Sequence, residues 1–301
     1  MSIPAPIHGL PSQIWGWLNQ PHLQAAQLQE RLAYTVVFSE QGFAAGEQEL
    51  REDYWPNRVP VCWLGGPAIM AAGESWPRNS AGEPLAHIAC FELSGVAGAL
   101  DAEGKRQWGQ QLSEGLPTEG YLQIFHDLQT YGYEAEDGQT EGWLVRWLHP
   151  SAELEIRDAP ADLDLPEPAC QVGLPMASFS PPSSLDGDYI EAQFDAAEHA
   201  IEEYQASWTL QRTGDPDSFP VPVTHLYGHS QAGQEVPCQE VLPEVLPLTA
   251  EQDDYRLIAD IESWTSLAGW FGDASPLEVW MRQSDLQKHD YTMAWCMIRT
   301  D

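Results

Sequence analysis

Basic residues are scarce in this chain, and lysine is the scarcest. The 301 residues include 13 Lys and Arg against 46 Asp and Glu, a formal net charge of −33. The two lysines are Lys105 and Lys288. Folding does not need such an imbalance, because repulsion between like charges opposes compaction; it affects solubility, steering and the choice of partner instead. The charge disfavours nucleic acid and anionic membrane as direct ligands and favours a basic protein as partner.

Features of export and of membrane insertion are also missing. The opening MSIPAPIHGL has neither the basic nor the apolar region of a signal peptide, and the sequence has no run of about 18 apolar residues. The five cysteines are widely scattered, and Cys62, Cys90 and Cys296 lie inside apolar runs. Buried free thiols are typical of a reducing compartment. We therefore expect a cytoplasmic protein that does not span a membrane.

Motifs for cofactors and metals are absent as well. The chain has no GxGxxG or GxxxxGK[ST] loop, no CxxC and no HExxH. His87 and Cys90 would point to opposite faces of a strand, because residues three apart do not share a face. The oxygen-rich runs 162–164 and 186–191 lack the spacing of an EF-hand. We expect no metal and no cofactor.

One segment, GHSQA at 228–232, resembles the nucleophile elbow of α/β hydrolases, with Ser230 as the nucleophile. The elbow needs a helix directly after the serine to supply backbone donors to the oxyanion. The residues that follow contain Pro237 and Pro243 and show no helical period. The sequence therefore favours a polar loop and assigns no catalytic residue, and a serine hydrolase stays an alternative.

Hydrophobic residues make up 43% of the chain, which is enough for a sizeable core. Helical patterns occur at 12–33 and 186–208, and 213–250 is rich in Pro and Gly and predicts mainly loop. Strand patterns occur at 34–38, 59–66, 85–93, 120–127, 143–148, 221–227, 256–262, 276–281 and 291–298. Together they predict an α+β fold with mostly antiparallel sheets and a few helices.

Two of the strand pairs resemble each other. Aligning Ile88-Ala89 with Ile258-Ala259 also aligns Leu122-Gln-Ile-Phe with Leu277-Glu-Val-Trp. A third strand pattern follows each pair. This similarity indicates a weak internal duplication of the strand motif.

The pattern at 186–208 predicts an amphipathic helix with an acidic face. Such a face is often only solvated, but here the acids continue upstream through 153–167. A surface with one sign of charge speeds association with a partner of opposite charge. We predict that a basic partner binds this face, at Asp186, Asp188, Glu191, Asp195, Glu198, Glu202 and Glu203.

The predicted elements divide the chain into two parts. An N-terminal segment of helix and strand, 1–58, is expected to pack on a main α+β domain, 59–301. The main domain has two related halves, about 59–150 and 205–301. An acidic linker and helix over 151–204 joins these halves.

Short motifs in both halves match a known pattern. The first half contains Leu64-Gly-Gly-Pro67, Glu74-Ser-Trp-Pro77 and the run 116–127, and the second contains Trp270-Phe-Gly-Asp273 and the run 285–291. With them the chain resembles the YwqG-like family, also called the domain of unknown function DUF1963, over roughly 60–301. The motif residues are Gly65, Gly66, Pro67, Trp76, Pro77, Trp270, Gly272, Asp273 and Asp285.

The chain departs from the family pattern in two places. The usual glutamine of the central strand is Ala89 or Cys90 here, and the usual glycine after the W-G-D turn is replaced by Ala274-Ser275. The resemblance implies an α+β fold with a duplicated sheet motif. It carries no established catalytic residues to these positions.

Families of this kind often occur beside secreted toxins, so the resemblance also implies an immunity function. Combined with the charge, it predicts an acidic cytoplasmic immunity protein that binds a basic antibacterial toxin stoichiometrically and covers its active site. Two alternatives stay open. One is a housekeeping protein that binds a small ligand, and the other is a serine hydrolase that uses Ser230.

Overall fold

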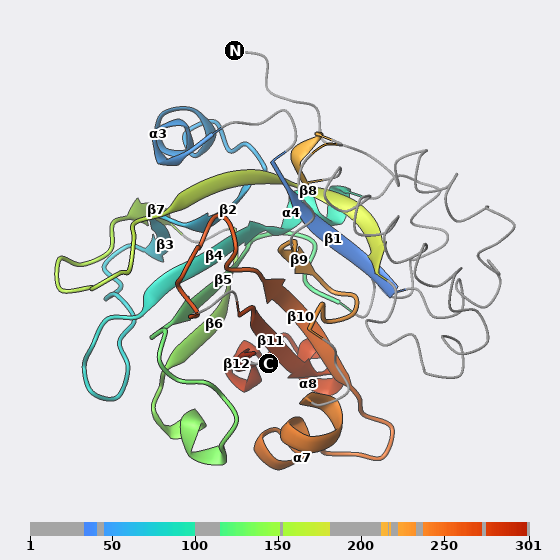
Figure 1. The fold of residues 1–301 in the computed structure, drawn as a ribbon. Helices are drawn as coiled ribbons and strands as arrows, with labels where there is room; N and C mark the ends of the chain where they lie inside the picture. Colours follow the sequence, from blue (N-terminus) through green and yellow to red (C-terminus); the bar gives the residue numbers. More distant parts are fainter. Residues whose placement is uncertain are drawn as a thin grey trace, which may run out of the picture.

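The structure is a computed structural model of the chain. It describes residues 33–40, 45–99, 115–150, 153–180, 212–215, 217, 222–232, 237–272 and 275–299. One large, strongly curved sheet dominates these residues, with loops and short helices around it (Figure 1). None of the helices within these ranges is long and apolar enough to cross a membrane.

Ten strands form the large sheet, in the order β12-β11-β10-β9-β1-β8-β2-β4-β5-β6. Every neighbouring pair is antiparallel. The strands are β1 (Ala33–Ser39), β2 (Cys62–Gly65), β4 (Ala86–Glu92), β5 (Tyr121–His126), β6 (Trp143–Leu148), β8 (Cys170–Ser180), β9 (His225–Leu226), β10 (Tyr255–Ile261), β11 (Leu277–Arg282) and β12 (Trp295–Ile298).

The remaining elements are short. A second sheet pairs β3 (Ala68–Ala71) with β7 (Leu154–Arg157). The α-helices of the described part are α3 (Glu47–Glu49), α4 (Leu93–Gly98), α7 (Leu242–Val245) and α8 (Gln283–Gln287). Two π-helical turns, η2 (Leu50–Tyr54) and η4 (Pro237–Val241), and two 3-10 turns, η3 (Ala135–Gln139) and η5 (Tyr291–Met293), complete them. The predicted excess of antiparallel strands is confirmed, and the architecture is mostly β rather than clearly α+β.

The two central strands connect the halves of the sheet. β1 pairs with β8 along Ala33–Ser39, and on their outer sides β1 pairs with β9 and β8 with β2. All but the first residue of β1 are buried, as expected for a strand with neighbours on both sides and a β-branched, aromatic sequence. The sheet therefore has its centre in two strands that come from outside the duplicated segments.

β8 and β7 lie in 151–204, where the sequence predicts an acidic linker and a helix. Gly173 and Pro175 concealed the strand pattern of β8, since both residues weaken strands. β8 pairs with β2 only over Cys170–Gly173, so Pro175 lies beyond that ladder, where its missing N–H costs no hydrogen bond to β2.

The duplicated strand pairs have the same register. In β4–β5 the pairing shifts between His87 and Ala89, and in β10–β11 it shifts between Leu257 and Ala259. The residue passed over is the aligned isoleucine of each repeat. Such an irregularity bends a strand locally, and it occurs at the same place in both halves.

A glutamate caps the turn that follows β4, and another caps the turn that follows β10. The side chain of Glu92 accepts a hydrogen bond from the backbone N–H of Gly95 at 2.7 Å, and that of Glu262 accepts one from Thr265 at 3.0 Å. The donor is three residues after the acid in both cases. A side chain that satisfies a free N–H stabilises the start of a helical turn, so the local structure repeats beyond the strands.

The sheet curls until its ends meet. The ring of Trp143 in β6 lies edge-on to that of Trp295 in β12, with centroids 4.8 Å apart. The Trp295 indole N–H donates to the carbonyl of Gly132 at 2.7 Å, and the N–H of Ile298 donates to the carbonyl of Tyr131 at 3.1 Å. The bond from the Ile298 N–H occupies one group on the outer edge of β12, an edge that would otherwise offer unpaired backbone groups.

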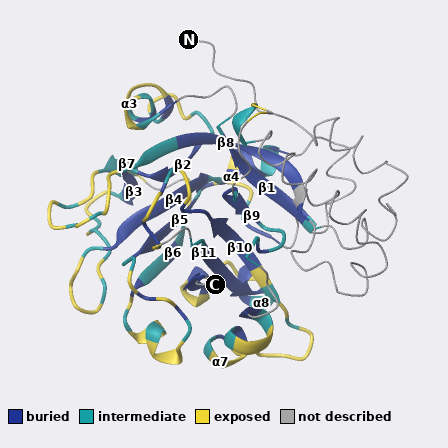
Figure 2. Ribbon diagram, viewed as in Figure 1, coloured by how far each residue is buried: buried dark blue, intermediate teal, exposed yellow. Residues whose placement is uncertain are grey.

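Both halves contribute to one hydrophobic core. Figure 2 shows the strands of the large sheet mainly as buried and most of the exposed residues in the loops and short helices around it. The main apolar cluster contains Leu64 and Ile124 from the first half and Ile258 and Val279 from the second. Contacts across the halves therefore stabilise each half.

Most predicted strands are confirmed, with ends that differ by at most three residues. The exceptions are 221–227, where β9 is only His225–Leu226, and 291–298, which begins with η5 before β12. The helices predicted over 12–33 and 186–208 fall outside the described residues, apart from Ala33, which begins β1. The division into 1–58 and 59–301 stays a prediction.

The region 213–250, predicted mainly as loop, contains η4 and α7. Its prolines do not prevent this, because Pro243 lies in the first turn of α7. At that position the N–H that proline lacks would have no partner within the helix. The run after Ser230, which shows no helical period in the sequence, therefore contains short helical turns from Pro237 onward.

The turn after β2 provides a test of this packing. Gly65 has a φ of +64°, and a Cβ placed there would lie 2.3 Å from the carbonyl oxygen of Ala169. Gly73 has a φ of +77° with no atom within 4 Å. We expect Gly65→Ala to lower the free energy of unfolding by roughly 3 kcal/mol, from strain and clash together. Gly73→Ala should cost about 1 kcal/mol, from strain alone. Urea unfolding of both variants measures this, and equal losses would contradict it.

Candidate functional site

The partner-binding acids predicted from the sequence lie outside the described residues. They are Asp186, Asp188, Glu191, Asp195, Glu198, Glu202 and Glu203. Their role stays a prediction. The sites that follow are built from described residues only.

The Gly-Gly-Pro motif forms a tight turn after β2. Gly65 and Gly66 both have a left-handed φ, of +64° and +63°, which glycine adopts without strain. The Trp63 indole N–H donates to the carbonyl of Pro67 at 2.9 Å, and the N–H of Gly66 donates to Ala169 at 2.6 Å. The motif therefore holds the end of β2 against the start of β8.

The second half contains the same turn after β9. Tyr227 and Gly228 have φ values of +60° and +82°. His225, which precedes them as Trp63 precedes the first turn, places Nε2 3.1 Å from the carbonyl of His229, four residues on. β9 and β2 also hold equivalent positions beside β10 and β4. The repeat therefore includes a turn that the sequence comparison of the strands did not cover.

The first-half motif Trp76-Pro77 fixes the loop before β4. The Trp76 indole N–H donates to the carbonyl of Leu85 at 2.8 Å, and the N–H of Leu85 donates to the carbonyl of Pro77 at 3.0 Å. The Trp76 ring also lies edge-on to Phe125 of β5, at 5.7 Å. Both motif residues shape the backbone and carry no reactive group.

The second-half motif residues are structural in the same way. The Trp270 indole N–H donates to the carbonyl of Glu167 at 3.0 Å, and Gly272 has a φ of +87°. Asp285 accepts a 2.5 Å hydrogen bond from Nε of Arg282, and both side chains are buried. Asp273 lies outside the described residues.

Ser230 does not form a nucleophile elbow. Its side chain is buried, and its hydroxyl donates to the carboxylate of Glu278. The imidazole of His225 has backbone carbonyls at both ring nitrogens, those of Val223 and His229. No imidazole accepts the Ser230 hydroxyl among the described residues, so the geometry gives no support to activation of this serine by histidine.

Two buried acids lie together on β10 and β11. Asp260 and Glu278 are directly opposite each other in the strand register, and both are fully buried. Nη1 of Arg299 donates to both oxygens of Glu278, at 3.1 and 3.0 Å, and the Trp280 indole N–H donates to it at 2.9 Å. The N–H of Gln231 donates to Asp260 at 2.9 Å.

Burial is the main effect on both carboxyl groups. It raises the pKa of Glu278 to about 7, with the neighbouring Asp260 adding to the shift and Arg299 opposing it. It raises the pKa of Asp260 to about 6. One Asp260 oxygen also lacks a hydrogen-bond partner. Asp260 and Glu278 therefore hold protons more tightly than exposed acids do, as expected for a desolvated carboxyl pair.

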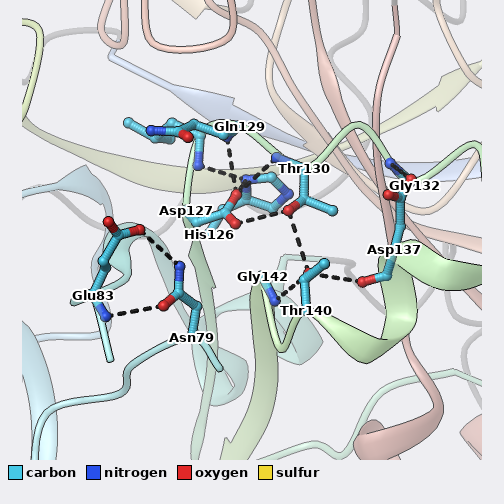
Figure 3. A network of polar contacts seen from close by, with 11 residues as sticks. Asn79, Glu83, His126, Asp127, Gln129, Thr130, Gly132, Asp137, Thr140 and Gly142 are labelled. Atoms are coloured by element: carbon cyan, nitrogen blue, oxygen red, sulfur yellow. Dashed lines mark hydrogen bonds and ion pairs between the residues drawn. The ribbon is translucent and has the colours of Figure 1, made fainter. Parts of the chain in front are cut away.

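A polar network surrounds the loop after β5 (Figure 3). Asp127 accepts hydrogen bonds from the backbone of Gln129 and Thr130 and from the Thr130 hydroxyl, at 2.9, 2.9 and 2.7 Å. Asp137 accepts one from the N–H of Gly132 at 2.9 Å. His126 is buried and stacks on Trp143, and burial lowers its pKa to about 4. The carboxylates of the network accept hydrogen bonds from the same loops, and these bonds hold the loops in place.

An exposed surface borders this network. A cavity of about 590 Å³ opens there, lined in part by Asp127, Asp137 and Tyr133. Tyr131, also in the lining, is 49% exposed. Glu134, Glu136 and Glu141 are exposed beside it and form no ion pair with another described residue. We call Tyr131, Glu134, Glu136 and Glu141 the η3 surface. It combines an exposed aromatic side chain with uncompensated negative charge.

Most of the described cations already have partners, and Arg212, whose Nε and Nη1 lack hydrogen-bond partners, is the exception among the described residues. Eight of them lie within ion-pair distance of a carboxylate: Arg51, Arg78, Arg146, Arg157, Arg256, Arg282, Lys288 and Arg299. Arg58 lies over the ring of Trp55, at 4.5 Å. The exposed acids beyond these pairs therefore find little positive charge within the described part of the chain.

Clusters that suit a metal ion are missing from the described ranges. No three His, Cys, Asp or Glu side chains within them are grouped as ligands. All five cysteines are free thiols, and burial raises the pKa of Cys62 and Cys170 to about 12. The cysteines thus contribute apolar surface rather than reactive thiolate.

A family comparison agrees with the motifs. The model of the family described as "Domain of unknown function (DUF1963)" matches residues 63–299. No curated protein matches the sequence. The match includes every motif residue from Gly65 to Asp285, so it supports the resemblance based on them.

Sequence reasoning missed the buried pair and the η3 surface. The duplication offered a signal for the pair: Asp260 and Glu278 occupy the register positions of Cys90 and Gln123 in the first half, which makes two uncharged positions acidic. For the η3 surface, only the run of acids near 134–141 was visible. Its closeness to an exposed tyrosine and a cavity depends on the loop structure.

The buried pair predicts a specific pH dependence. Asp260 and Glu278 bind protons more tightly in the folded protein than in the unfolded chain, so their contribution to stability decreases as the pH rises from about 4 to about 7. Asp260→Asn removes one carboxylate. Between pH about 4 and about 7, the free energy of unfolding of the variant should rise relative to that of the parent by on the order of 3 kcal/mol.

Urea unfolding at several pH values measures this difference. Glu244→Gln, at an exposed position of α7, is the matched control and should follow the parent at every pH. If the free energies of unfolding of Asp260→Asn and the parent change in parallel with pH, Asp260 and Glu278 do not titrate as a coupled buried pair.

Proposed function

The chain belongs to the DUF1963 family, and we propose that it is an acidic binding protein whose partner is a basic protein. The use of most of the described cations in internal ion pairs carries this proposal. Exposed acids outside those pairs can gain favourable contacts from a cationic partner. The finer form of the proposal is a cytoplasmic immunity protein that neutralises a cognate antibacterial toxin.

The net charge by itself favours fast association with a partner, but it does not supply high affinity. A net charge of −33 attracts a cationic partner over a distance of about 10 Å at 0.1 M salt. Rim charges of this kind raise the association rate and reject acidic competitors. Affinity then has to come from a desolvated anchor at the centre of the interface.

The η3 surface offers such an anchor. Tyr131 is an exposed aromatic side chain, and tyrosine is enriched among residues that dominate binding energy. Glu134, Glu136 and Glu141 surround it with negative charge, and the adjoining cavity has room for a long basic side chain. A lysine or arginine of the partner would pair with these carboxylates and contact the tyrosine ring.

Inhibition would follow from occlusion. Enzymes that act on anionic substrates, such as nucleic acids, present cations in their clefts. An acidic surface that binds those cations competes with the substrate without any chemical step. The protein would then act at one copy per toxin, and its own residues would need no nucleophile.

The serine hydrolase alternative gains no support from the site. Ser230 is buried and donates to Glu278, and no imidazole accepts its hydroxyl within the described residues. The alternative of a small-ligand-binding protein does not depend on the exposed acids, so it is compatible with a protein partner.

Capture of the partner tests the proposal directly. The tagged protein is used to isolate partners from a lysate of its own organism at moderate salt, and the kinetics with the purified partner are then measured. We expect a basic protein at one-to-one stoichiometry whose toxicity in cells disappears on co-expression. Its association rate should fall several-fold between low and physiological salt while dissociation changes less. An association rate that does not depend on salt would remove charge from the mechanism.

The docking surface is tested with paired charge variants. Glu134→Gln with Glu136→Gln removes two charges beside Tyr131, and Glu52→Gln with Asp53→Asn removes two from η2. In Figure 1, η2 follows α3 in the upper part of the view, whereas η3, in green, lies at the bottom. We expect the first pair to weaken binding at least tenfold and the second by less than about threefold. Tyr131→Ala should cost about 2 kcal/mol of binding energy. Equal effects of both pairs would exclude the η3 surface.

A further inference from the structure

The loop after β9 bonds to a buried group of charges. We call residues 228–232 the strap. Three consecutive strap residues each bond to a different member of the group: the Ser230 hydroxyl donates to Glu278, the Gln231 N–H donates to Asp260 at 2.9 Å, and the Ala232 carbonyl accepts from Nη2 of Arg299 at 3.4 Å. The strap is therefore bonded to both buried acids and to the arginine that accompanies them.

This group has fewer cations than acids. Asp260 and Glu278 lie opposite each other in the strand register, and Arg299 forms an ion pair with Glu278 at 3.0 Å. Ionisation of both acids would leave one uncompensated negative charge among buried residues, which is costly. A single proton on the pair removes that charge.

The titratable groups packed against the pair do not supply the missing positive charge. On β9, His225 lies opposite Asp260, and burial lowers the pKa of His225, so its imidazole is neutral near pH 7. Glu262, directly after β10, adds its repulsion to the effect of burial on Asp260. Burial raises the pKa of the Cys238 thiol, in η4, to about 12, so this thiol is uncharged.

Burial and hydrogen bonding act on the pair in opposite directions. The bonds from the strap favour the ionised carboxylates, because each donor interacts more strongly with a charged acceptor. Burial is the larger effect, and it raises the pKa of Glu278 to about 7 and that of Asp260 to about 6. The pair therefore binds a proton more tightly while it is buried than when water reaches it.

The strap can move without breaking the sheet. It lies outside the strands, and Gln231 and Ala232 are partly exposed. The two acids, by contrast, are fully buried in strands that are paired on both sides. Gly228, at the start of the strap, has a φ of +82°, and glycine can leave that conformation without strain. Local opening of the strap therefore breaks few backbone hydrogen bonds.

Uncharged anchors hold the strap as well. The His229 N–H donates to the hydroxyl of Ser180 in β8 at 2.9 Å, and the Val223 N–H donates to Oε1 of Gln231 at 2.8 Å. Neither bond involves a group that titrates near neutral pH. A change of the strap with pH therefore reports on the acid pair.

We propose that the strap is a proton-dependent latch. It is closed while Asp260 and Glu278 share a proton, and it opens locally, with the sheet still folded, when that proton is lost. Opening lets water reach the carboxylates and removes the cost of a buried, uncompensated charge. The latch uses none of the acids of the η3 surface, so it stands or fails independently of the proposed protein partner.

Hydrogen exchange at the Gln231 amide, followed by NMR on the full-length protein, measures the latch, because opening releases this N–H. We expect its protection factor, corrected for the intrinsic exchange rate, to fall at least tenfold between about pH 5 and about pH 7. The reason is that the closed strap binds more protons than the open one over this range. At about pH 7 the protection should also be at least tenfold below that of amides in β4 and β5, which are released when the sheet unfolds.

Three variants separate the latch from general stability. Asp260→Asn leaves one acid beside Arg299, so the Gln231 protection should change less than about threefold over the same pH range. Ser180→Ala removes an uncharged anchor and should lower the protection by the same factor at both pH values. Glu244→Gln, at an exposed position of α7, removes a charge elsewhere and should keep the fall seen in the parent.

Three results would overturn the proposal. One is a Gln231 protection equal to that of β4 and β5 at about pH 7, and another is a protection in the parent that does not change with pH. The third is an unchanged fall in Asp260→Asn. If Asp260→Asn fails to fold, Glu278→Gln takes its place, because it also leaves a single acid in the group.

Discussion

With an excess of 33 negative charges, this chain can form a compact structure only where its carboxylates spread over the surface or pair with its few cations. Most of the described arginines meet this constraint by forming ion pairs with acids of the same chain. Arg282 and Arg299 neutralise the buried acids Asp285 and Glu278, and Arg51 holds Glu47 and Asp158 together. Cations used in this way are not available to offset the outer surface. The same constraint that shapes the fold therefore leaves the exterior acidic, which is the basis of the proposed binding of a cationic partner.

The repeated halves show how one backbone arrangement carries different chemistry. In the first half, Arg146 donates to the neutral Gln123, at 3.1 Å from Nε. In the second half, Arg299 donates to Glu278, which lies opposite Asp260. Replacing a neutral pair of positions with two acids raises the electrostatic cost of burial. That cost is only partly offset by Arg299, which is why the pKa values of both acids rise.

The proposed docking surface depends on loops and not on the large sheet itself. A polar network fixes the loops of the η3 surface, and the acids of that surface are exposed to solvent. The family model covers this surface, and its description names no function for it.

Much of the sheet could be predicted from local sequence because alternation and apolar runs act at short range. The strands β1, β4, β5, β10 and β11 fall where the patterns place them, and the matching bulges follow the aligned isoleucines. The strand β8 was missed, since Gly173 and Pro175 obscure its pattern and its pairing with the distant strands β1 and β2 is not visible in the sequence.

By itself, the sequence determined the charge, the repeated strand motif and the family, because composition and short motifs need no contacts between distant residues. The tertiary structure decided that Ser230 is buried against Glu278, that Asp260 faces Glu278, and that Nε2 of His87 is buried without a hydrogen-bond partner. Each of these depends on which strands are neighbours and in what register. Sequence spacing alone does not specify that pairing, since a shift of one residue would turn every side chain to the other face.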